Sequence, residues 1–172
     1  ELSIAEIRKY TKEAAPLIHC ITNPISIHDC ANIILAAGAR PIMAEHPAEV
    51  AEITAVASAL MLNLGNITDA RIESIQRALK EANRRKIPVL LDLVGVTCSS
   101  LRREFARKLL TDGRFAVIKG NISEILAAAD LPFHGTGIDA GSQDAISQAN
   151  EASYCTTAKK LAEHLGCTVM AT

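Results

Sequence analysis

The sequence predicts an α/β fold in which helices pack on a mostly parallel central sheet. The first indication is the stretch Ile87–Ile125, in which two short apolar runs, 87–91 and 115–118, each end in a polar cluster and enclose a helical pattern. Such a pattern is typical of a βαβ unit. The second indication is that apolar runs and helical patterns alternate along the rest of the chain. We therefore predict a three-layer α/β/α arrangement forming a single domain over residues 1–172.

Composition excludes several classes of function. The chain has 172 residues, 49% of them apolar, and a formal net charge of −1, which is typical of a globular domain with a substantial core. Three Phe, two Tyr and no Trp, without a basic stripe, argue against a nucleic-acid partner. The charged amino terminus lacks a signal region, and no apolar run is long enough to span a membrane. We expect a cytoplasmic protein without a membrane partner.

The cysteines predict neither a disulfide framework nor a zinc site. There are five, an odd number, and none is spaced as Cys-x-x-Cys. Reduced thiols are the rule in a cytoplasm. Cys98 lies in the predicted loop after Asp92. Nothing nearby in the sequence would lower the pKa of its thiol, so we expect Cys98 to be unreactive.

Caps and helix breakers predict the elements of the amino-terminal half. Ser3 and Glu6 have the spacing of a capping box, Thr68 is a suitable cap, and Pro16 and Gly38 are suitable helix stops. Apolar periodicity supplies the rest. The predicted helices are 3–14, 25–37, 45–58 and 68–85, and the predicted strands are 17–21, 40–43 and 59–64.

The carboxyl-terminal half continues the alternation after the central block. A helix is predicted at 100–110, a loop rich in turn formers at 131–141, a helix at 143–165 and an apolar strand at 167–172. A buried strand with nothing to cover it leaves an edge that promotes aggregation. We therefore expect the domain to be incomplete at its carboxyl end.

Polar residues at the ends of two predicted strands form the candidate site. Asp92 ends one strand, and Lys119, Asn121 and Glu124 follow the next. Ligands of open α/β sheets bind at the carboxyl ends of the strands, so these side chains would face one crevice. Two acids and a cation there are typical of a site for a metal-bound nucleotide.

Each of these residues also has a structural interpretation. Asp92 alone is better explained as a turn aspartate that accepts backbone N–H groups. Asn121 and Glu124 have the spacing of a helix capping box. Lys119 and Gly120 favour an anion-binding site. Lys119 supplies a positive charge, and Gly120, which has no side chain, leaves the backbone accessible at the amino terminus of a helix. For residues 119–124, the sequence alone leaves both the structural and the functional interpretation open.

These motifs carry a family resemblance. Asp92–Gly95 and Lys119–Glu124 resemble the Asp-Pro-Val-Gly and Arg-Gly-Asn-x-x-Glu motifs of hydroxyethylthiazole kinase, a thiamine-pathway enzyme with a ribokinase-like fold. Their order and spacing, together with the other matching segments, make the resemblance specific. It extends over almost the whole chain and corresponds to the amino-terminal two-thirds of the family. The other matching segments are 19–24, 36–44, 62–65, 138–141 and 169–172.

The resemblance implies a kinase that transfers the γ-phosphoryl group of ATP to the hydroxyl of 4-methyl-5-(2-hydroxyethyl)thiazole. It implies Mg²⁺ as cofactor and a homotrimer with active sites between neighbouring subunits. Carried over by position, it places Asn23, Met43 and Gly65 near the thiazole alcohol. It assigns Asp92 and Glu124 to Mg²⁺, and Lys119, Asn121 and Thr172 to ATP.

The sequence departs from the family pattern at several positions. Leu93 stands in place of Pro, Lys119 in place of Arg, and residues 97–99 in place of a Gly-Ala-Thr-like segment. The family's Gly-Thr-Gly-Cys segment, with its catalytic Cys, would lie beyond Thr172, so no catalytic residue is predicted within this chain. Two alternatives stay open: a ribokinase-like kinase for another small alcohol, and a catalytically silent nucleotide-binding homologue.

Overall fold

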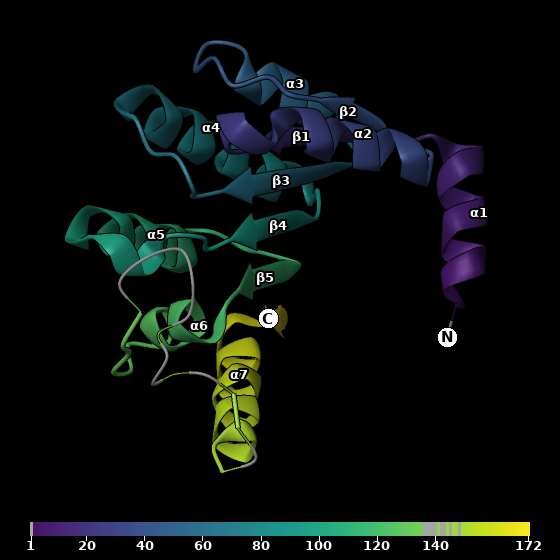
Figure 1. Cartoon of the computed structure of the whole chain (residues 1–172). Coiled ribbons are helices and arrows are strands. Elements are labelled where there is room, and N and C mark those ends of the chain that lie inside the picture. The colour runs from purple at the N-terminus through teal and green to yellow at the C-terminus, as the bar shows by residue number, and fades with distance from the viewer. Residues whose placement is uncertain (1, 136–140, 142–143, 145, 148) are drawn as a thin grey trace. The chain divides into compact units, whose positions relative to one another are not determined.

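Strands and helices alternate along the chain in a computed structural model (Figure 1). The structure describes residues 2–135, 141, 144, 146–147 and 149–172. The chain divides into two compact units, Glu1–Leu62 with Thr68–Pro88 and Asn63–Ile67 with Val89–Thr172. The single domain expected from the sequence stays a prediction. In the described residues, no helix combines the length and the apolar character that a membrane crossing requires.

The first unit is built on three parallel strands. β1 (Leu17–Ile21) lies between β2 (Arg40–Ile42) and β3 (Ala59–Asn63) and pairs with both. Apolar residues of the strands and of α4 are buried and form its core, among them Ile21, Leu60, Leu62, Ile75 and Leu79. Its helices are α1 (Ile4–Ala14), α2 (Ile27–Ala37), α3 (Val50–Val56) and α4 (Asp69–Arg85), with a 3₁₀ turn at Pro24–Ser26.

The predicted caps of this unit are confirmed. Ser3 and Glu6 form the capping box of α1, and the Thr68 side chain accepts the N–H of Arg71 at the start of α4. Gly38 ends α2 with a φ of 96°. A Cβ at Gly38 would lie 2.4 Å from Cγ of Lys12, so a glycine is needed where α1 packs against α2.

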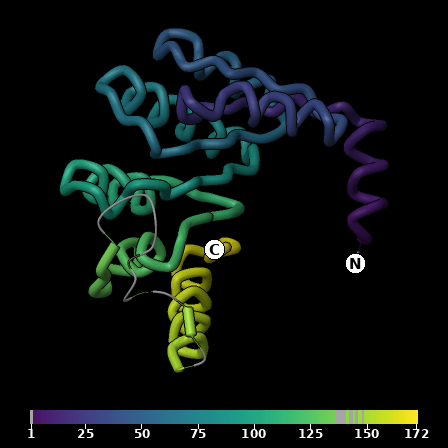
Figure 2. Tube along the Cα trace, in the orientation of Figure 1, coloured from purple at the N-terminus to yellow at the C-terminus, as the bar shows by residue number. Residues whose placement is uncertain are grey.

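The second unit contains the predicted βαβ block and a third parallel strand. β5 (Val117–Gly120) lies between β4 (Val89–Asp92) and β6 (Thr168–Ala171) and pairs with both. Figure 2 follows the chain from β4 through α5 to β5 and α6, and from α7 to β6 at its yellow end. The helices are α5 (Ser100–Asp112), α6 (Ile122–Ala128) and α7 (Glu151–Leu165), with a 3₁₀ turn at Val96–Cys98.

Two predicted helices are shorter than expected. The helix predicted at 45–58 begins only at Val50. The reason is a turn at His46, whose carbonyl accepts the N–H groups of Glu49 and Val50 and whose Nδ1 accepts that of Ala48. The ring nitrogen of His46 thus accepts a backbone N–H where the helix was predicted to begin, and the regular helix starts four residues later.

The helix predicted at 143–165 begins at Glu151. Before it, the Asn150 side chain accepts the N–H of Ser147 at 2.7 Å, and the Asp144 carboxylate accepts hydrogen bonds from Ser123 and His134. These hydrogen bonds lie in the part of the predicted helix that precedes Glu151. Residues 136–140 of the predicted loop, which include part of the family-like segment 138–141, lie outside the described residues, as does Gln143.

Candidate functional site

Asp92 and Lys119 lie side by side at the carboxyl ends of β4 and β5. The parallel register pairs the two residues directly, and Nζ of Lys119 is 3.4 Å from Oδ2 of Asp92. Both side chains remain partly accessible, at 14% for Asp92 and 35% for Lys119. The pair is therefore open to a ligand, and its charges partly neutralise each other.

Asp92 also makes the turn predicted for it. Its Oδ1 accepts the N–H of Val94 at 3.1 Å, and Gly95 follows with a φ of 78°. Since Oδ1 serves the turn and Oδ2 faces Lys119, the structural and the functional interpretation of Asp92 are compatible.

Leu93 uses its backbone N–H, which a proline would lack. It donates to the carbonyl of Lys119 at 2.9 Å, and its side chain is fully buried. The hydrogen bond extends the β4–β5 ladder by one residue beyond Asp92. This departure from the family pattern thus ties the turn more closely to β5.

Glu124 and Asn121 form the predicted capping box of α6. Oδ1 of Asn121 accepts the N–H of Glu124 at 2.9 Å, and Oε2 of Glu124 accepts the N–H of Asn121 at 2.8 Å. Oε1 of Glu124 accepts a third bond, from Gly95 at 2.8 Å. Gly120 allows this approach, since a Cβ there would lie 3.2 Å from Oε2.

Burial is the largest influence on the pKa of Glu124. The residue is 2% exposed, and this desolvation raises its pKa. The backbone hydrogen bonds from Asn121 and Gly95 act in the opposite direction, while Asp92 raises the pKa further and Lys119 lowers it. The influence of both Asp92 and Lys119 places the two acids and the cation in one electrostatic environment.

Thr172 lies beside Gly120 at the end of β6. Its N–H donates to the Gly120 carbonyl at 3.0 Å, and its Oγ1 is 3.5 Å from the same oxygen. Three neighbouring strands therefore end at one level, as predicted. We call their polar residues the strand-end cluster: Asp92, Lys119, Asn121, Glu124 and Thr172.

Gly65 belongs to the same unit, in the loop after β3. The loop is tied to β4 by the N–H of Leu64, which donates to the Asp92 carbonyl at 3.1 Å. Arg102, in the first turn of α5, donates to the carbonyls of Leu64 and Gly65. The sequence showed Arg102 as one of several basic residues in a helix, and no local signal distinguished it.

Asn23 and Met43 lie in the first unit. Asn23 caps the 3₁₀ turn after β1, since its Oδ1 accepts the N–H of Ile25 at 3.2 Å. Met43 directly follows β2 and is half-buried. The structure thus places both residues at the carboxyl ends of neighbouring strands. Their contact with a substrate stays a prediction.

The donor set of the strand-end cluster fits Mg²⁺ bound together with phosphates. Mg²⁺ keeps several waters and takes one or two carboxylates in nucleotide sites, rather than a complete protein cage. Asp92 and Glu124 are the two carboxylates of the cluster, and their role toward a metal stays a prediction. No group of three or more His, Cys, Asp or Glu that could hold a metal ion occurs among the residues that the structure describes.

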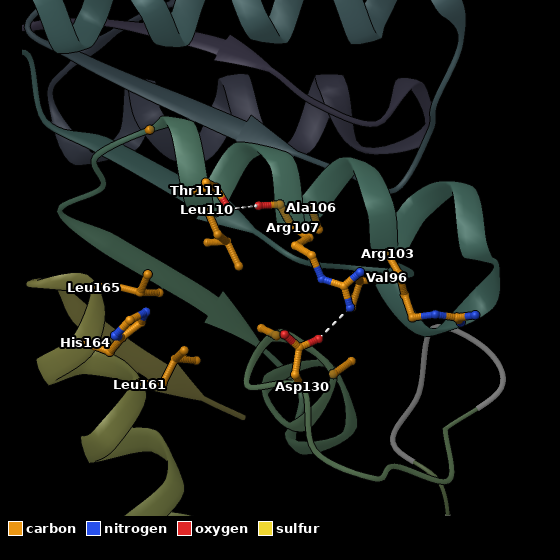
Figure 3. Close-up of a pocket in the computed structure, with 13 residues that line it drawn as sticks. Val96, Arg103, Ala106, Arg107, Leu110, Thr111, Asp130, Leu161, His164 and Leu165 are labelled. Carbon is orange, nitrogen blue, oxygen red and sulfur yellow. Dashed lines mark hydrogen bonds and ion pairs between the residues drawn. The ribbon is translucent and has the colours of Figure 1, made fainter.

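The second unit also contains a pocket of about 430 Å³ between α5 and α7 (Figure 3). Leu110 and Ala106 of α5 line one side, and Leu161 and Leu165 of α7 line the other. An ion pair between Arg107 and Asp130, 2.6 Å between Nη2 and Oδ1, lies at the pocket. The pocket includes none of the residues of the strand-end cluster.

Comparison with known proteins identifies the family. The model of the hydroxyethylthiazole kinase family matches residues 8–172. The chain belongs to this family. Hydroxyethylthiazole kinase 2 of Clostridium botulinum (strain 657 / Type Ba4) is 51% identical over 167 residues, and hydroxyethylthiazole kinase of Desulfovibrio desulfuricans is 40% identical over 166 residues.

These relatives are longer than the chain. The matches cover 97% and 96% of this chain but 63% and 58% of the two relatives. The solved structure of a hydroxyethylthiazole kinase protein from Pyrococcus horikoshii OT3 superposes with a TM-score of 0.82 at 29% identity, covering 97% of this chain and 59% of that one.

The ribokinase-like α/β fold is also confirmed. A point mutant of phosphofructokinase-2 from Escherichia coli matches with a TM-score of 0.51 at 10% identity, over 94% of this chain and 57% of that one. This likeness concerns the fold alone. It agrees with the parallel strands and the alternating helices of this member of the hydroxyethylthiazole kinase family.

Proposed function

We propose that the protein is an ATP- and Mg²⁺-dependent kinase that phosphorylates the hydroxyl of 4-methyl-5-(2-hydroxyethyl)thiazole in the thiamine pathway. Membership of the hydroxyethylthiazole kinase family supports this reaction. The observation that carries the proposal is the pairing of Asp92 with Lys119 across β4 and β5, 3.4 Å between Oδ2 and Nζ. A triphosphate and its metal require a cation and a carboxylate close together, and this pair would supply both.

Asp92 and Glu124 would hold Mg²⁺. Oδ2 of Asp92 is the accessible oxygen, because Oδ1 accepts the N–H of Val94. Both oxygens of Glu124 already accept backbone N–H groups, so we assign Glu124 to the metal through water. When bound, Mg²⁺ neutralises charge on the transferred phosphoryl group.

Lys119, Asn121 and Thr172 would contact ATP, and Asn23, Met43 and Gly65 the thiazole alcohol. Lys119 provides a single compact charge rather than the two-pronged donor of an arginine. Its pairing with Asp92 keeps the ammonium at the strand ends, from where it can turn to the phosphates. Catalysis by these residues is mainly positioning and charge neutralisation.

We also propose a homotrimer in the cytoplasm. Exposed apolar side chains on α1 and α2 support self-association: Ile4 is 86% exposed and Ile33 69% exposed. Neither helix contains a buried residue, although α2 is rich in Ile. Apolar surface of this kind is expected where another copy of the chain packs. Five free cysteines agree with a reducing compartment.

The Asp92→Asn variant of the full-length protein, compared with its active parent, tests the site. Asn retains an oxygen for the Val94 N–H but loses the negative charge, so we expect ATP-dependent formation of the phosphorylated alcohol to be lost. The product is measured by mass spectrometry, with Asp112→Asn at the exposed end of α5 as the matched control. If Asp92→Asn keeps the activity of the parent, the metal assignment is wrong.

A panel of small alcohols tests the alternative substrates. The different turn at Leu93, with its bond to the Lys119 carbonyl, is the observation that favours another alcohol. Faster turnover of another alcohol than of the thiazole compound would support a different ribokinase-like kinase. A rise in the melting temperature with ATP, without turnover of any alcohol, would instead indicate a silent nucleotide-binding homologue.

A further inference from the structure

We propose that Arg71 is a positioning residue that holds together the two loops carrying Asn23 and Met43. The proposal rests on the proposed function, in which these two residues contact the thiazole alcohol. Arg71 lies in the first turn of α4, and neither its position in the sequence nor the family resemblance assigned it a role.

One guanidinium group bridges the two loops. Nη1 of Arg71 donates to the carbonyl of Thr22 at 2.6 Å, directly before Asn23 in the loop after β1. Nη2 donates to the carboxylate of Glu45, two residues after Met43 in the loop after β2. Arg71 therefore fixes the backbone on one side and a side chain on the other, each next to a predicted substrate contact.

Burial makes these bonds necessary. The Arg71 side chain is 5% exposed, and Thr22 is 2% exposed. A guanidinium remains charged in proteins, and a buried charge requires partners because it has lost its hydration. The Thr22 carbonyl and the Glu45 carboxylate are those partners, so a displacement of either loop would leave a charge poorly compensated.

Other side chains hold the second loop from two directions. Oγ of Ser74, one turn after Arg71 on α4, donates to the Glu45 carbonyl at 2.7 Å. The buried ring of His19 on β1 lies with Nε2 2.8 Å from the Ala44 carbonyl and with Nδ1 2.8 Å from Oγ1 of Thr54. The backbone on the carboxyl side of Met43 is therefore fixed from both α4 and β1.

This arrangement predicts a selective kinetic effect. Arg71 contacts neither substrate in this assignment, so its loss should displace Asn23 and Met43 and leave the binding of ATP unchanged. Misplaced binding groups weaken the binding of the substrate that they contact. The KM for the alcohol should rise while the KM for ATP stays constant.

The Arg71→Lys variant is the sharpest test. Lys keeps the charge and much of the volume but lacks the planar pair of donors, so one of the two loops loses its bond. We expect a rise of about tenfold in the KM for the alcohol, the effect of one hydrogen bond to a charged group. Arg84→Lys is the matched control, because exposed Arg84 on the same helix pairs with Glu81.

Amide hydrogen exchange gives a second measurement that does not need turnover. Arg71→Lys should accelerate exchange in residues 22–26 and 43–46, whereas Arg84→Lys should leave both segments as in the parent. An inactive parent protein would contradict the proposed function, and the exchange data would still test the hold of Arg71 on the loops. Unchanged exchange in both segments, or equal rises in the KM values of both substrates, would overturn the proposal.

Discussion

The backbone N–H of Gly95 donates to Oε1 of Glu124 at 2.8 Å and so joins the turn after β4 to the first turn of α6. Oε2 of the same carboxylate accepts the N–H of Asn121. Asp92 begins the turn and Asn121 caps the helix, so one buried side chain fixes two parts of the strand-end cluster. Glu124 therefore has a structural role that is independent of any metal.

The Glu124→Gln variant should be less stable than the parent. The two oxygens of Glu124 accept the N–H groups of Gly95 and Asn121, whereas the amide of Gln has only one acceptor oxygen. In the variant, the NH₂ group would therefore face one of these N–H groups and leave it without an acceptor. We expect the free energy of unfolding to fall by about 1–3 kcal/mol, the cost of an unsatisfied buried donor. Urea denaturation measures this, with exposed Glu104→Gln on α5 as the control. Equal midpoints for both variants would contradict the role of Glu124 as a link.

The Leu93→Pro variant restores the residue type of the family motif and should nevertheless destabilise this protein. Proline cannot donate to the Lys119 carbonyl, and it also replaces a fully buried Leu. We expect a loss of about 1–3 kcal/mol from the unpaired carbonyl, with a further loss from packing. Leu93→Met, which keeps the N–H and similar volume, should remain close to the parent in thermal unfolding. A fully stable Leu93→Pro would show that the bond contributes little.

Protonation of His19 should weaken the fold at acidic pH. Burial lowers the pKa of His19 below its ordinary value of 6.5, so the folded protein holds the ring neutral while the unfolded chain takes up a proton. The unfolded state then binds more protons below about pH 6.5, and stability is lost as the pH falls from that value.

Urea denaturation at several pH values measures this effect. The loss below pH 6.5 should be absent in His19→Gln and retained in His164→Gln, whose side chain is exposed. Glu124 contributes with the opposite sign, because its raised pKa favours the folded state at low pH and this contribution is lost as the pH rises above 4.5. An unchanged pH dependence in His19→Gln would refute the assignment.

The Ile33→Glu variant should prevent self-association. Ile33 on α2 is 69% exposed, and a charge there would have to be buried in the proposed interface between copies. We expect a shift from trimer to monomer in light scattering coupled to size-exclusion chromatography. Leu101→Glu on α5, at a side chain that is 57% exposed, is the control and should keep the trimer. A trimeric Ile33→Glu would exclude α2 from the interface.

Local chemistry explains which parts of the fold were predictable. The capping boxes at Ser3 and Asn121, the cap at Thr68 and the glycine stop at Gly38 depend on residues within one helical turn. The structure confirms all four. The helix starts predicted at residues 45 and 143 were wrong, since the helices begin at Val50 and Glu151. Side-chain hydrogen bonds of His46 and Asp144, which periodicity does not register, precede both starts.

The strand-end cluster was predictable for a related reason. A parallel sheet brings the carboxyl ends of its strands to one edge, so Asp92, Lys119 and Thr172 could be expected at one level before their distances were known. The dual use of Glu124 was only half predictable: the bond to Asn121 follows from spacing, whereas the bond to Gly95 joins residues 29 positions apart.

The sequence by itself determined the order of strands and helices, the helix caps and the polar residues at the strand ends, because each depends on neighbours along the chain. Tertiary structure alone decided which distant groups meet. Arg71 reaches Thr22 and Glu45, and Arg102 reaches Leu64 and Gly65, across separations of 26 to 49 residues. Nothing in local composition encodes such pairs, since they form only when folding removes a buried charge from water and leaves backbone carbonyls and a carboxylate as its partners.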